Sequence, residues 1–210
     1  MAGVQLRAVH LLALAYLMGV AGSLWDWHEH LIGVSNQFPH VVIDVGGLLA
    51  IGVLAFSGWQ EVSNRTLVAL YTLLVIVVLL AFGPLVLMMT APHSGFMRLF
   101  MSWAMTRGAL SIELVIVVLA GFAAARWVRL APLAAWRIAA AAGVVVVAVA
   151  SVWDLYWHQT HPLEMGASMN MMALPPHQLI LAGFVLGLVG SGIGAALSAG
   201  SSGSAVRRAG

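Results

Sequence analysis

The sequence contains no cysteine and no lysine, and it carries few charges of either sign. The absence of cysteine excludes disulfides, thiolate nucleophiles and Cys-ligated metals, and it leaves the redox compartment undetermined. Charged residues make up 8% of the 210 residues, whereas a soluble domain carries roughly 25%. So few charges cannot cover a water-facing surface, and 62% of the residues are hydrophobic. We therefore predict an all-α integral membrane protein whose main solvent and partner is the lipid bilayer.

The basic residues do not form a patch that would bind nucleic acid. All nine are arginines, and they are scattered beside apolar segments. In that position they act as signals of membrane topology. The composition therefore predicts no nucleic-acid partner, in spite of the basic pI.

Hydrophobic segments long enough to cross a bilayer recur along the chain, since a spanning helix needs about 20 mostly apolar residues. Six segments meet this requirement, at residues 6–24, 40–58, 66–89, 109–127, 133–152 and 177–197. We predict a six-helix transmembrane bundle over residues 1–199, and a disordered Ser/Gly-rich cytoplasmic tail over residues 200–210. The first segment has some features of a signal peptide, but its apolar run is long, so we interpret it as a retained helix.

The arginines also orient the predicted spans. If the N-terminus is cytoplasmic, seven of the nine arginines fall in cytoplasmic segments, and only Arg98 and Arg107 fall in outer ones. This asymmetry follows the positive-inside rule. We therefore expect a multi-pass protein of the cell membrane with both termini cytoplasmic, and with outward-facing loops after the first, third and fifth spans.

A polar motif occurs twice, at the end of the first and of the fifth predicted span. Each copy reads S-x-W-D-x-x-x-H, and after a loop a Pro-His pair opens the next span, with a glycine six residues beyond that histidine. The matching residues are Ser23, Trp25, Asp26, His30, Pro39, His40 and Gly46 in the first copy, and Ser151, Trp153, Asp154, His158, Pro176, His177 and Gly183 in the second. Matches in this order predict an internal duplication, in which helices one and two resemble helices five and six. Both copies should lie at the extracytoplasmic face.

The spacing of the motif suits metal binding. An Asp and a His four residues apart lie on one face of a helix, where they can hold one metal ion or hydrogen-bond to each other. A proline suits the first helical turn, and the positive end of the helix dipole keeps the histidine that follows it neutral, as a metal ligand must be. The predicted ligands, in one dinuclear site or two separate sites, are Asp26, His30, His40, Asp154, His158 and His177, with His161 and His93 as further candidates. The competing interpretation is that these residues only form helix-end hydrogen bonds at the membrane interface.

Two acids fall inside predicted spans without belonging to the motif. Asp44 lies four residues after His40, and Glu113 lies about one turn inside the fourth predicted span. Ionisable groups at membrane depth are costly and usually functional. We therefore predict that both act in catalysis by proton transfer or by supporting the ligands. His10 lies at the cytoplasmic end and His28 on another helix face than Asp26, so neither is expected in the site.

Asp and His ligands suit iron, zinc or copper(II), while methionine favours copper(I). Methionines are frequent in the second loop, at residues 165, 169, 171 and 172, so copper is the expected metal, with iron or zinc as alternatives. The Asp-x-x-x-His pattern with a later His, at the end of a membrane helix, resembles the metal-ligand set in the C subunit of copper-containing membrane monooxygenases, the methane and ammonia oxidisers. The resemblance covers three residues per copy, and it implies copper binding by Asp26, His30 and His40 or by Asp154, His158 and His177. It also implies membrane partner subunits.

Several functions are compatible with these features. The duplicated ligands favour a copper- or iron-dependent membrane oxidoreductase. The Met-rich loop favours a copper-binding or transfer protein, or an assembly protein for a respiratory oxidase. A haem-binding electron carrier, with His40 and His177 as axial ligands, would not need the paired aspartates. A transporter is a further alternative, because internal repeats are common in that class.

Overall fold

The computed structural model describes residues 2–32, 38–57, 109–129, 134–160 and 174–207. In these ranges the chain is helical and has no strand. The helices are α1 (Ala2–Leu31), α2 (Phe38–Ser57), α5 (Ala109–Arg129), α6 (Ala135–Thr160) and α7 (Pro175–Arg207). The expectation of an all-α protein is confirmed for this part of the chain.

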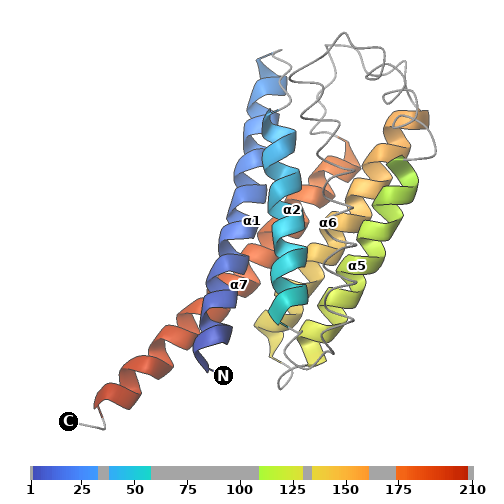
Figure 1. Cartoon of the computed structure of the whole chain (residues 1–210). Coiled ribbons are helices and arrows are strands. Elements are labelled where there is room, and N and C mark those ends of the chain that lie inside the picture. The colour runs from blue at the N-terminus through green and yellow to red at the C-terminus, as the bar shows by residue number, and fades with distance from the viewer. Residues whose placement is uncertain (1, 33–37, 58–108, 130–133, 161–173, 208–210) are drawn as a thin grey trace.

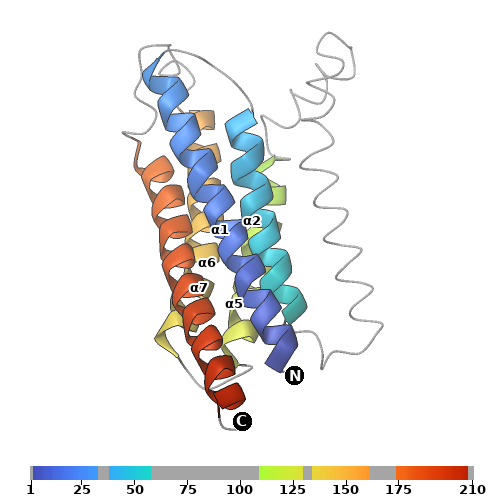
Figure 2. The same ribbon diagram turned by 90° about the vertical axis from the view of Figure 1, so that its left-hand side faces the viewer.

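The helices lie side by side in one bundle, in which α1 and α6 run in one direction and α2, α5 and α7 run in the other (Figures 1 and 2). The most extensive contacts are within the pairs α1–α2 and α6–α7, and α1 joins the two pairs by packing against α7. Helix α5 packs against α6 and α2. As a result, α1 begins and α7 ends at the same end of the bundle (Figure 1).

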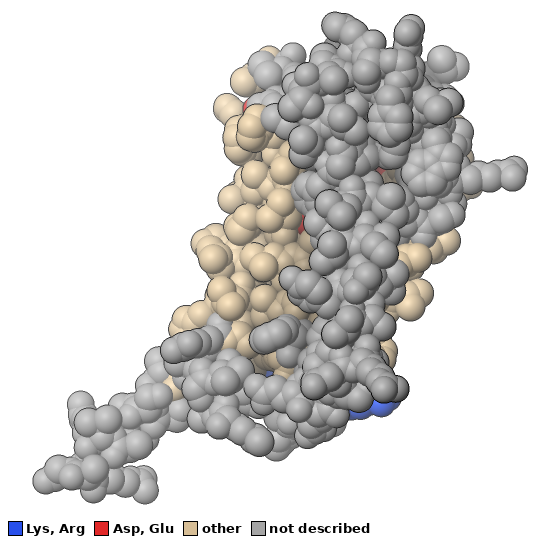
Figure 3. All heavy atoms as spheres, viewed as in Figure 1, with Lys and Arg blue, Asp and Glu red and all other residues tan. Residues whose placement is uncertain are grey.

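Four of the described helices are long and apolar enough to cross a membrane. These segments are Ala8–Leu31, Phe38–Ala55, Ala135–Trp157 and Pro175–Ser198. They correspond to the first, second, fifth and sixth predicted spans. The fourth predicted span, residues 109–127, forms α5 but is not among these four segments, and the third, residues 66–89, lies outside the described residues. On the face shown in Figure 3, the described surface is almost entirely uncharged, as a lipid-facing bundle requires.

Two helix ends differ from the boundaries expected from hydropathy. Helix α1 runs to Leu31 and α6 to Thr160, so each includes about two turns that the apolar runs leave out. These turns contain the polar motifs. Hydropathy leaves them out because a polar residue ends a hydrophobic run without ending a helix. Helix α7 likewise continues to Arg207, through part of the segment for which the composition predicts disorder. Extending a formed helix is easier than starting a new one, because nucleation is the costly step.

The core of the bundle combines small residues with a few large ones. Tyr16 of α1 and Phe184 of α7 are fully buried, and their rings meet edge to face with centroids 6.4 Å apart. The Tyr16 hydroxyl donates a hydrogen bond to the carbonyl of Ala140 in α6. This aromatic pair therefore connects three helices across the centre of the bundle.

Glycines set the distance between the helices within each pair. A Cβ added at Gly46 of α2 would lie 2.8 Å from the Gly19 nitrogen and 2.9 Å from the Ala15 oxygen of α1. A Cβ added at Gly183 of α7 would lie 2.9 Å from the Val147 nitrogen and 3.0 Å from the Gly143 oxygen of α6. In both pairs, the backbone atoms of the partner helix nearest to the added Cβ are an amide nitrogen and the carbonyl oxygen of the residue four positions earlier. Only glycine permits so close an approach of two helix backbones.

Candidate functional site

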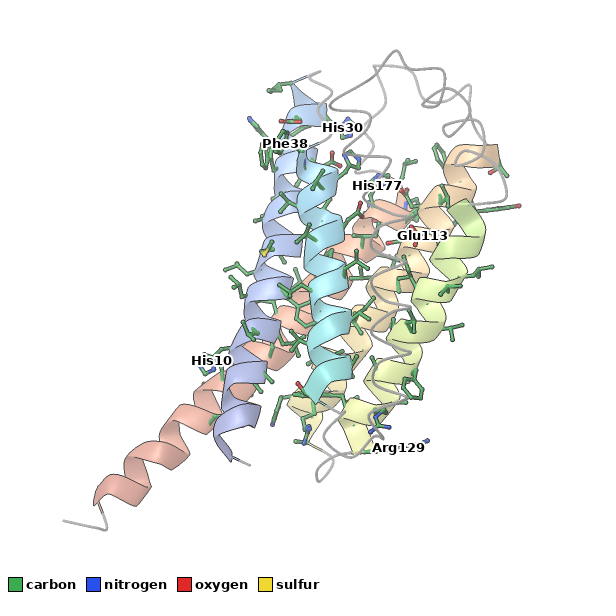
Figure 4. All side chains as sticks on the ribbon, viewed as in Figure 1. His10, His30, Phe38, Glu113, Arg129 and His177 are labelled. Carbon is green, nitrogen blue, oxygen red and sulfur yellow. The ribbon has the colours of Figure 1, made fainter. Side chains whose placement is uncertain are left out.

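A polar cavity lies near the end of the bundle opposite to the chain ends of α1 and α7. Its volume is about 200 Å³, and all five described helices contribute to its wall. The lining residues are Ser23, Asp26, His40, Ile43, Asp44, Glu113, Ser151, Asp154, Leu155, His177 and Ile180. They come from the C-terminal parts of α1 and α6 and from the N-terminal parts of α2, α5 and α7. These ends meet because α1 and α6 run opposite to α2, α5 and α7 (Figure 4).

Asp26 is the most enclosed acid of the cavity, with 4% of its side chain exposed. Its Oδ1 lies 3.5 Å from His30 Nε2 and 3.6 Å from His40 Nδ1. Both ring nitrogens are buried, and neither has a hydrogen-bond partner among the described residues. One carboxylate oxygen is therefore faced by two imidazole nitrogens at distances longer than a typical hydrogen bond.

Asp154 and His177 form the corresponding contact on the other helix pair. His177 Nδ1 lies 3.2 Å from Asp154 Oδ1, with 9% and 21% of the two side chains exposed. His177 is the third residue of α7, as His40 is the third residue of α2. The same nitrogen of each histidine thus faces the same oxygen of the aspartate on the preceding motif helix.

Two serines add hydroxyl groups to the wall, and the sequence analysis did not assign them to the site. Ser23 Oγ donates to the Gly19 carbonyl at 2.9 Å, and Ser151 Oγ donates to the Val147 carbonyl at 3.0 Å. Each hydroxyl hydrogen is used within its own helix, so the oxygen lone pairs are what the hydroxyl offers to a ligand. The signal that could have found them is their place in the repeated motif.

Asp44 of α2 and Glu113 of α5, the two acids inside the predicted spans, also line the cavity. Together with Asp26 and Asp154 they place four carboxyl groups around one cavity in an apolar bundle. Carboxylates that line one cavity raise each other's energy unless a cation or a proton lies between them. The cavity is therefore suited to positive charge.

Three of the predicted ligands lie wholly or with their side chains outside the described residues. His158 is on α6, but its side chain lies outside the described residues, as do His161 and His93. His10 lies toward the opposite end of the bundle, in agreement with its exclusion from the site (Figure 4), and His28 is exposed.

Within the described part of the chain, no group of three or more His, Asp or Glu side chains is arranged to hold a metal ion. Asp26 is faced by two histidines and Asp154 by one, but the positions of these side chains do not make a metal-holding group of three. The sequence analysis did not single out Glu29 as a buried acid. Its side chain is buried and accepts a hydrogen bond from Trp25 Nε1 at 2.7 Å.

Comparisons with known proteins identify no relative of the chain. No protein-family model matches the chain, and neither the curated proteins nor the solved structures give a match. The functional argument therefore depends on the chemistry of the cavity.

Proposed function

We propose that the chain is a membrane metalloprotein whose cavity binds a transition-metal ion, and that this metal serves an oxidoreductase reaction. The observation that carries the proposal is the pair of matched contacts, His40 with Asp26 and His177 with Asp154, which face one cavity. Carboxylate oxygens and neutral imidazoles are the donors that copper(II), iron and zinc share. A purely structural pair of helix ends would not need a polar cavity between them.

The separations between these atoms support a cation. Ligand atoms about 2.0–2.1 Å from a tetrahedral metal lie about 3.3–3.4 Å from each other. The three Asp–His separations, 3.2, 3.5 and 3.6 Å, bracket this value. A hydrogen bond between charged partners would be about 2.7–2.9 Å long. A complete coordination shell requires further donors, for which His158 and His161 are the candidates on the second copy.

The size of the cavity favours an ion over a large organic group. Its volume of about 200 Å³ is below the roughly 300–1,000 Å³ of typical small-molecule and cofactor sites. An ion with a few waters fits this volume, whereas a haem between His40 and His177 does not. We therefore propose copper as the metal, with iron or zinc as the alternative.

We also propose that α1–α2 and α6–α7 are two copies of one helical unit within a six-span bundle. The support is that both the Asp–His contact and the glycine approach recur in the same register in the two pairs. In that arrangement both termini are cytoplasmic, and the cavity lies toward the outer face.

In this proposal Asp44 and Glu113 carry protons. They line the cavity but belong to neither Asp–His pair, so they can accept or release a proton beside the metal without acting as its ligands. The resemblance to the copper monooxygenases adds partner subunits to the proposal. A second candidate function is copper transfer, which is favoured by the partial exposure of His40, at 44% of its side chain, since a transfer site must be reached by a partner.

The test is the metal content of the detergent-purified protein, measured by mass spectrometry together with a visible spectrum. We expect one or two ions per chain, and a loss of at least one in Asp26→Asn and in Asp154→Asn. Glu29→Gln is the matched control, because Glu29 is a buried acid on α1 that is hydrogen-bonded to Trp25 and does not line the cavity.

Full metal content in the double Asn variant would show that these aspartates are not ligands. Oxygen consumption or substrate oxidation by the metal-loaded wild type would favour the oxidoreductase over the transfer protein. Metal release to a chelating acceptor without turnover would favour transfer.

A further inference from the structure

The described helices carry their charges at opposite ends. The acids Asp26, Glu29, Asp44, Glu113 and Asp154 all lie in the half of the bundle that contains the cavity. The arginines of the same helices are Arg7, Arg126, Arg129, Arg137 and Arg207, and all lie toward the other end. Figure 4 shows this separation for Glu113 and Arg129 on a single helix, α5. The arginine end therefore has no described acid to balance its charge.

Arg137 is the unusual member of this group, because it is buried with 5% of its surface exposed. Its guanidinium lies over the Trp127 ring at 4.6 Å and 5.6 Å from the centre of the Trp136 ring. Its Nε is enclosed and has no hydrogen-bond partner among the described residues. The tryptophan rings meet edge to face, with centroids 6.4 Å apart, so they hold the guanidinium in a fixed orientation.

A guanidinium held in this way is prepared to bind an anion. The aromatic rings contact the guanidinium, while the Nε–H, which donates in the plane of the group, is left without a described partner. Planar, paired donors of this kind match the oxygens of a phosphate. Arg137 is also the third residue of α6, where the helix dipole repels a cation and attracts an anion.

Neighbouring residues extend the site toward lipid. Arg129 ends α5 and is exposed, so it adds a second positive charge at the same end of the bundle. Ile138 and Phe122 are each 47% exposed and lie within one to two turns of these arginines along α6 and α5. Cationic donors beside exposed apolar side chains suit a ligand with a phosphate and acyl chains better than they suit a free phosphate ion.

We infer that Arg137, supported by Arg129 and the first turn of α6, binds the phosphate headgroup of an anionic phospholipid. This site is separate from the cavity and does not depend on the proposed metal function. The tryptophans orient the guanidinium, Arg129 increases the affinity, and the apolar side chains contact the acyl chains.

The experiment is native mass spectrometry of protein purified in detergent and equilibrated with phosphatidylglycerol and phosphatidylcholine of the same acyl chains. The wild type should retain phosphatidylglycerol in preference to phosphatidylcholine. An arginine near an anionic headgroup contributes about 1 kcal/mol, so Arg129→Gln should reduce retention about fivefold. Arg137→Gln should abolish the preference. Arg129 is exposed, so its variant tests the site even if the Arg137 variant fails to fold.

Arg207→Gln is the matched control, because it removes the same charge at the far end of α7. It should leave retention unchanged, and an equal loss in this variant would show diffuse attraction and overturn the specific site. Displacement of the lipid by millimolar inorganic phosphate would show that free phosphate is the ligand and would overturn the assignment to lipid. Equal retention of the two lipids by the wild type would also refute the proposal.

Discussion

The close approach of α2 to α1, and of α7 to α6, leads to a quantitative prediction about two glycines. Gly46→Ala and Gly183→Ala each place a methyl group 2.8–3.0 Å from backbone atoms of the partner helix. Carbon atoms in contact are normally about 3.5–4.0 Å from their neighbours. Because backbone atoms are among those met at both positions, a rotamer change cannot relieve the clash, and the two helices must separate.

The expected magnitude is the difference between two opposing effects. Overpacking a tight interface typically costs about 1–3 kcal/mol. Alanine in place of glycine favours a helix by about 1 kcal/mol. A clash with backbone should have an overpacking cost in the upper part of the range of about 1–3 kcal/mol. After the gain in helix propensity is subtracted, we expect each variant to lose about 1–2 kcal/mol of unfolding free energy.

The chain offers matched controls on the same two helices. No described atom lies within 4 Å of a Cβ added at Gly52 of α2 or at Gly192 of α7. Gly52→Ala and Gly192→Ala should therefore be neutral or gain up to about 1 kcal/mol from helix propensity. The measurement is the unfolding free energy in mixed micelles, from an SDS titration followed by far-UV circular dichroism. If the Gly46 and Gly183 variants were as stable as these controls, the helix pairs would not pack in the register described.

Three further outcomes are expected. Tyr16→Phe removes the hydrogen bond to the carbonyl of Ala140 and should lower the unfolding free energy by about 0.5–1.5 kcal/mol in the same titration; an unchanged value would mean that the bond contributes nothing. Trp25→Phe removes the donor to Glu29 and should cost about 1 kcal/mol, whereas the same change in a Glu29→Gln background should cost less. Copper at one hundred times its dissociation constant should stabilise the wild type by about 2.7 kcal/mol; equal stabilisation of Asp154→Asn would argue against a metal bound at that aspartate.

The sequence was sufficient to predict the all-helical class and most of the apolar spans. A helix in lipid must satisfy its backbone internally and bury about 20 apolar residues, so hydropathy alone reports it. The same reasoning placed helix ends too early in α1 and α6. Asp26 and Asp154 interrupt a hydrophobic run, but they continue the helix because helical hydrogen bonding does not depend on the polarity of the side chain.

The repeated motif also predicted two local features of the site. The i, i+4 spacing of Asp26 and His30 fixes their contact within one helix turn, and the Pro-His pairs placed His40 and His177 at helix N-termini. Local geometry decides both features, so both could be read from spacing.

Only the tertiary structure brought Asp26 to His40, Asp154 to His177, and both pairs to one cavity with Asp44 and Glu113. These contacts join residues on different helices, and their distances depend on how closely the helices pack. The glycines at positions 46 and 183 set that packing, through contacts that a spacing pattern cannot reveal. Arg137 shows the same limit: by sequence it is one more charge at a helix end, whereas the positions of Trp127 and Trp136 in space bury it and orient its donors. The sequence determined the helices and their polar residues, because those depend on neighbours along the chain. The assembled structure alone decided which polar residues share a site, because that depends on neighbours across the bundle.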